Sequence, residues 1–92
     1  MSVLGNPEDQ TTISVTTTPA ETQITEKMSA IEFVNMGSVD VYYGKLSTLT
    51  SIRGAPIFSN GGRRTFEEIP AGWRISFVTA SGGSTLRQIH YK

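Results

Sequence analysis

The chain has 92 residues, with eight basic and eight acidic side chains and no cysteine. This length allows one compact core but not two, so we expect a single domain. The lack of cysteine excludes disulfides and thiolate metal sites, and the balanced charges exclude the long-range field that draws proteins onto nucleic acids or anionic membranes.

Residues 1–10, MSVLGNPEDQ, mix turn-forming and acidic residues without a hydrophobic period. We therefore predict an irregular arm over 1–10 and one domain over 11–92. The arm lacks the apolar run of a signal peptide, which predicts synthesis in the cytoplasm. Residues 12–18 then alternate β-branched apolar and polar side chains, which is typical of a strand. Pro19 ends this strand, because proline cannot donate to a central ladder.

Residues 29–45, SAIEFVNMGSVDVYYGK, contain two strand-like runs on either side of Gly37 and Ser38. A two-residue connection of this kind favours a tight hairpin, in which Phe33 would pair with Tyr42. Sorting the paired residues by parity gives two apolar faces. One face has Val34, Met36, Val39, Val41 and Tyr43, and the other has Ile31, Phe33 and Tyr42.

Two apolar faces on one hairpin predict that the hairpin is covered twice, once by the core and once by another surface. A small chain without disulfides gains stability by association with further copies, so we expect a homo-oligomer. Parity does not say which face belongs to the core. Phe33 and Tyr42 are therefore candidate residues of an interface with another chain.

The second half of the chain continues with short strand-like runs separated by glycine-rich turns. Ser and Thr make up 22 of the 92 residues, which also favours strands and turns over helices. The sequence therefore predicts an all-β fold, a small antiparallel β-sandwich or jelly-roll-like barrel of about seven short strands. The runs are 55–58, 63–69, 73–79 and 85–91, and in the third of them Trp73, Ile75 and Phe77 have the parity of core residues.

The sequence contains few residues that are suited to catalysis. His90 is the one imidazole, and it lies two residues from the end of the sequence, where a rigid geometry is hard to maintain. Glu67 and Glu68 are adjacent, so on a strand they point to opposite faces and cannot form a carboxylate pair. We expect no enzymatic activity, no cofactor and no metal site.

Arg63 and Arg64 form the clearest basic pair. Two arginines give a weak phosphate-binding footprint, and the sequence lacks a platform of several aromatic residues near them, so no nucleic-acid partner is predicted. The two arginines are better suited to binding an acidic protein surface. An equally good interpretation is that they protect a strand edge against wrong pairing. We therefore include both arginines among the candidate interface residues. No run of 18 apolar residues occurs, so no membrane partner is predicted either.

Three segments of the chain are similar to the small β-sandwich structural proteins of tailed bacteriophages. They are TISVTTTPAETQI, IEFVNMGSVDVYYG and FEEIPAGWRISFVTASGGSTLRQI, and together they lie within residues 12–91. The second segment matches the hairpin pattern of that group at Ile31, Asn35, Gly37, Ser38, Asp40, Val41, Tyr42 and Gly44. These are turn and core positions, so the resemblance concerns the fold more than a site.

The resemblance implies a protein of the virion. Its leading form is a capsid decoration or cement protein that binds the major capsid protein as a symmetric oligomer, with a trimer favoured, and stabilises the shell. One alternative is a neck, collar or tail-associated component. A carbohydrate- or receptor-binding module, with Tyr42, Tyr43, Trp73 or Tyr91 as stacking residues, is a further alternative.

Overall fold

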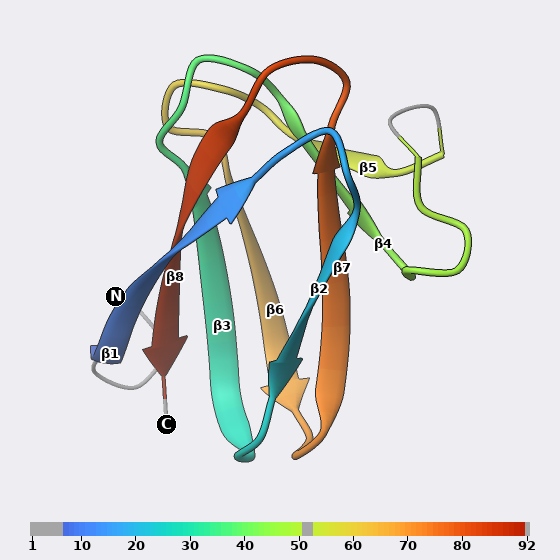
Figure 1. Cartoon of the computed structure of the whole chain (residues 1–92). Helices are drawn as coiled ribbons and strands as arrows, with labels where there is room; N and C mark the ends of the chain where they lie inside the picture. The colour runs from blue at the N-terminus through green and yellow to red at the C-terminus, as the bar shows by residue number, and fades with distance from the viewer. Residues whose placement is uncertain (1–6, 51–52, 92) are drawn as a thin grey trace.

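The computed structural model describes residues 7–50 and 53–91, and within these ranges the chain forms eight β-strands. Figure 1 shows them as two layers that face each other. The strands are β1 (Pro7–Val15), β2 (Ala20–Ile24), β3 (Met28–Asn35), β4 (Val41–Gly44), β5 (Ala55–Ile57), β6 (Arg63–Ile69), β7 (Trp73–Thr79) and β8 (Ser84–Tyr91). The all-β prediction is confirmed, with eight strands in place of about seven.

The two layers are four-stranded sheets with the orders β1-β8-β3-β6 and β2-β7-β4-β5. Every pairing is antiparallel. Apart from the step from β4 to β5, each strand is followed along the chain by a strand of the opposite sheet. Eight strands wound in this way give the jelly-roll form of the β-sandwich.

The core lies between the two sheets and takes alternate side chains from each. As predicted, Ile75 and Phe77 of β7 belong to it, and Trp73 packs against it. The rings of Phe33 and Phe77 join the sheets, with centroids 4.9 Å apart at 61°. The other buried members of the cluster are Val15, Ile24, Met28, Ile31, Val41, Ile57, Ile69 and Leu86.

The predicted hairpin between the strands on either side of Gly37 is wrong. In the structure β3 pairs with β6 and β8 in one sheet, whereas β4 pairs with β5 and β7 in the other. Phe33 therefore lies opposite Arg64 and Gln88 and does not pair with Tyr42. Because β3 has a partner on both sides, it has no edge for β4, and the connection crosses from one sheet to the other.

The second apolar face expected on the hairpin is covered within the chain itself. Tyr42 lies on the outer side of β4, opposite Val78 and Pro56. A β-carbon placed on Gly54 would lie 2.7 Å from Cβ of Tyr42 and 2.8 Å from Cδ1 of Leu49. The loop after β4 thus packs on this face and buries Leu49. Two apolar faces are therefore no argument for a second chain.

The irregular arm expected over 1–10 is wrong at residues 7–10, which belong to a strand. Strand β1 begins at Pro7 and pairs with β8 from Pro7 opposite Tyr91 to Val15 opposite Ser84, with a register shift between Pro7 and Asp9. The rest of the predicted arm, residues 1–6, lies outside the described residues. The strand extends further back than its hydrophobic alternation because backbone pairing with β8 does not require apolar side chains.

Candidate functional site

Three of the residues that matched the phage pattern, Asn35, Gly37 and Asp40, lie at or next to the connection between β3 and β4, which is at the upper end of the sandwich in Figure 1. Asn35, at the end of β3, is fully buried. Its Nδ2 donates to the carbonyls of Val39 at 2.9 Å and Ile57 at 3.0 Å. Its Oδ1 accepts from Gly37 N at 3.0 Å and from Ser84 Oγ at 2.6 Å. We call these contacts the Asn35 network. They tie together segments from three parts of the chain.

Two further residues of the pattern support the same network. A β-carbon added to Gly37 would overlap with Ser84 Oγ, so this position requires glycine. The carboxylate of Asp40 accepts a hydrogen bond from Ser59 N at 2.8 Å, and Gly37 O accepts one from Asn60 N at 2.9 Å. The loops 36–40 and 58–62 are thereby fixed against each other. The spacing of residues in this segment has a structural cause, and the segment is not itself a site.

Two of the four predicted interface residues are covered, fully or partly, by other parts of the same chain. Phe33 has no exposed surface and is central to the core, so its assignment to an interface is wrong. Its parity was compatible with either face, and the opposite sheet covers it. Tyr42 is half-buried beneath the loop that contains Leu49 and Gly54. Its place in an interface remains a prediction.

The other two, Arg63 and Arg64, lie on β6 at the edge of its sheet. Arg63 points to the outer face, where its Nη1 is 3.7 Å from Oε2 of Glu32 and 64% of its side chain remains exposed. Thr65 donates to the same oxygen of Glu32 at 3.3 Å. An ion pair this long and this exposed contributes well under ~1 kcal/mol. Arg63 therefore has donors available for a second partner.

Arg64 lies on the inner side of β6, where the space between the sheets opens. Its guanidinium carbon is 5.5 Å from the ring centroid of Phe66. Phe66 in turn packs edge-on against Tyr43, with centroids 5.3 Å apart, and against Trp73 at 5.3 Å. These half-buried rings close the open side of the sandwich beside β6. The two arginines thus lie side by side but on opposite faces of one exposed edge.

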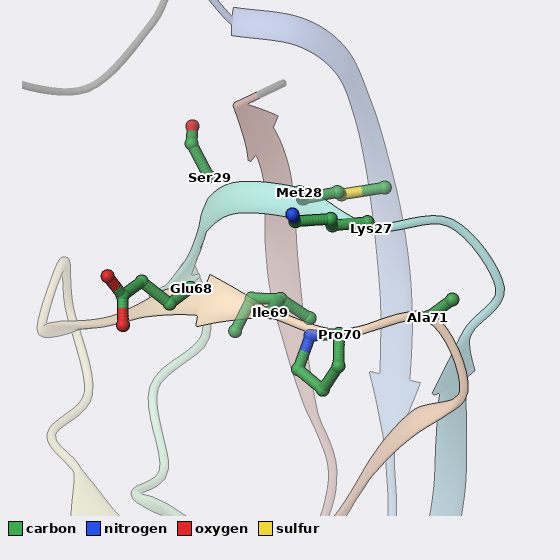
Figure 2. A pocket seen from close by; sticks show the side chains of 7 residues that line it. All are labelled: Lys27, Met28, Ser29, Glu68, Ile69, Pro70 and Ala71. Atoms are coloured by element: carbon green, nitrogen blue, oxygen red, sulfur yellow. The ribbon is translucent and has the colours of Figure 1, made fainter.

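A depression of about 810 Å³ lies where the start of β3 meets the end of β6. Figure 2 shows Lys27 and Met28 on one side of it, and Ile69 and Pro70 on the other. Glu68 has a left-handed φ of 56°, which allows Phe66 and Ile69 both to face the interior. The floor of the depression is thus part of the core, with charged groups at its rim, and it brings together no set of groups suited to catalysis.

His90 faces a smaller space of about 250 Å³ together with Gln88, Gln23 and Glu26. Its Nε2 contacts Nε2 of Gln88, and Oε1 of the buried Gln88 has no hydrogen-bond partner among the described residues. His90 is therefore neither fully exposed nor paired with a nucleophile there. This polar pocket was not expected from the sequence, because it depends on Gln88 facing inwards at a position of core parity.

Within the described ranges, no three His, Cys, Asp or Glu side chains lie close enough to hold a metal ion. In the same part of the chain, no helix is long and apolar enough to cross a membrane. The fold places the chain in the class of jelly-roll β-sandwich domains. No protein-family model matches the chain, and neither does any curated protein.

Proposed function

We propose that this chain is a structural protein of a tailed-bacteriophage particle, and specifically a capsid decoration protein. In this role it binds the major capsid protein on the outer shell as a symmetric homo-oligomer and stabilises the shell. It is made in the host cytoplasm and acts in the virion, without an enzymatic step, a cofactor, a nucleic acid or a membrane.

The observation that supports this proposal most is the strand order, β1-β8-β3-β6 against β2-β7-β4-β5. Jelly rolls of this kind build viral capsid domains, and they also build lectins and other proteins, so the support is by analogy of fold. The resemblance to phage structural proteins adds to it. The matching residues Asn35, Gly37 and Asp40 have defined roles in holding this fold together.

A carbohydrate-binding role finds less support in the placement of the four candidate stacking residues. Tyr43 and Trp73 both pack against Phe66 at the side of the sandwich. Tyr42 faces the loop after β4, and Tyr91 lies on the other sheet. Stacking on sugars requires rings that present one shared face to solvent, and of these four rings only Tyr43 and Trp73 lie on the same side of the sandwich.

The position within the particle separates the decoration role from the neck or tail role. Empty shells that lack the protein can be mixed with the purified chain and tested for binding and heat resistance. We expect saturable binding over the whole shell surface and a higher temperature of shell disruption, because a bound cement protein stabilises only the assembled state. Binding at a single vertex would assign the chain to the neck, and the absence of binding would contradict a capsid role.

A further inference from the structure

Strand β6 offers an open edge. Among the described strands it pairs with β3 alone, and all its residues before Ile69 are exposed or half-buried. Figure 1 shows it at the end of its sheet. The unpaired N–H and C=O groups of such an edge can pair with a strand of another chain.

The hydrogen bonds of β3 show which residues of β6 point to this edge. Asn35 N donates to Gly62 O at 2.7 Å, whereas Met36 N donates to Thr85 O on the opposite side at 2.8 Å. Bonding in an antiparallel ladder alternates, so Arg64, which lies opposite Phe33, points its backbone groups towards β3. The backbone groups of residues 63, 65 and 67 therefore point to the open edge.

The charge of the side chains along β6 changes from positive to negative near the middle of the strand. The strand sequence is RRTFEEI, with both arginines before Thr65 and both glutamates after Phe66. An antiparallel copy of the strand would place positive residues opposite negative ones. The other edge strands lack this property: PEDQTTISV and AETQI contain acidic but no basic residues, and API is uncharged.

We propose that β6 pairs antiparallel with β6 of a second copy about a two-fold axis at Thr65. In this register Thr65 faces Thr65 of the second copy, and Arg63 faces its Glu67. A two-fold axis perpendicular to the sheet requires opposed residues on the same face, and Arg63, Thr65 and Glu67 share the outer face. On the inner face Arg64 comes to lie beside Phe66 of the second copy, which allows a cation–π contact between the two chains.

The contact joins two sheets into one continuous sheet and closes at two copies, because it is isologous. The edge geometry therefore favours a dimer where the sequence favoured a trimer. The adjacent register, centred on Phe66, would place Thr65 opposite Glu67 and would extend beyond Glu68, whose φ of 56° interrupts the extended backbone. The register at Thr65 ends before that residue. The proposal does not depend on the role of the chain in a phage particle.

A cysteine cross-link tests the contact and its register, since the chain has no cysteine of its own. Hydrogen-bonded residues in an antiparallel pair have Cα atoms about 5.5 Å apart, a distance that a disulfide can bridge. We expect Thr65→Cys to give a disulfide-linked dimer under mild oxidation. Glu67→Cys is the matched control, because two such residues would lie about 13 Å apart along the strands. Equal cross-linking of both variants, or of neither, would overturn the proposal.

Sedimentation equilibrium of the unmodified chain should give twice the chain mass of 10.0 kDa at high concentration. Glu67→Arg should abolish the dimer by placing arginines opposite each other, and Arg63→Glu combined with Glu67→Arg should restore it. Gln23→Arg, on the edge strand β2, should leave the mass unchanged. A wild-type mass of one or three copies, or a Glu67→Arg variant that remains a dimer, would contradict this interface.

Discussion

Phe33→Asp and Val41→Asp should each prevent the chain from folding. Both side chains are completely buried between the two sheets. Removal of a buried phenylalanine alone costs about 3–5 kcal/mol, and an unpaired buried carboxylate adds several more. Domains of this kind are stable by only about 5–15 kcal/mol in total. The expected result is loss of the β-sheet signal in circular dichroism at neutral pH.

The matched control is Phe58→Asp, which introduces the same change at a side chain that is 64% exposed. This variant should retain the circular dichroism spectrum of the wild type and unfold at nearly the same urea concentration. If Phe33→Asp or Val41→Asp gave a folded, soluble monomer, the corresponding residue would lie on an outer face, and the arrangement of the two sheets described above would be wrong.

Asn35→Ala should cause the second large loss of stability. Its side chain makes four hydrogen bonds, two as donor and two as acceptor. With alanine at this position, the four groups that bond to the amide lose their partner in a largely dry site. Each buried group left unpaired lowers the free energy of unfolding by about 1–3 kcal/mol. Because water reaches part of the site after the change, we expect about 3–5 kcal/mol in total, measured by urea denaturation.

Two further variants at the same end of the molecule test whether the Asn35 network is the cause of this loss of stability. Ser84→Ala removes one of the four hydrogen bonds and should cost about 1 kcal/mol. Ser38→Ala changes an exposed residue of the same loop and should stay within about 0.5 kcal/mol of the wild type. An Asn35→Ala variant as stable as Ser38→Ala would show that the network does not hold the loops together.

Much of the fold follows from local patterns. The strands 63–69 and 73–79 were both predicted with their observed bounds, because glycine and proline residues mark their ends. The core residues of 73–79 were also predicted, because apolar and polar side chains alternate clearly there. The hairpin at Gly37 was wrong because a two-residue connection is a local signal, whereas the pairing of β3 is decided by distant strands. Buried Asn35 also holds the chain there, and two of its four partners, Ile57 and Ser84, are distant in the sequence.

Part of the basis for the proposed β6 contact is visible in the sequence. Sequence analysis placed Arg63 and Arg64 on a strand and suggested that they could protect its edge, and the structure places them on an edge strand. The proposed role of Glu67 was not anticipated, because pairing of this strand with a second copy was not considered when the two glutamates were rejected as a catalytic pair. The change of charge sign along β6 is visible in the sequence, but it has meaning only once the strand is known to have an open side. Phe33 was assigned to the interface because parity alone does not identify the covered face.

The composition of purified phage particles tests the proposed function most directly. The proposed function requires that a phage encodes this chain, and quantitative mass spectrometry of that phage's particles would measure the copy number of the chain relative to the major capsid protein. A decoration protein distributed over the shell should be present in a copy number comparable with that of the major capsid protein. Mild denaturant should release all copies of it from the shell surface. Absence of the chain from washed particles, with the protein found only in the host lysate, would contradict a structural role in the virion.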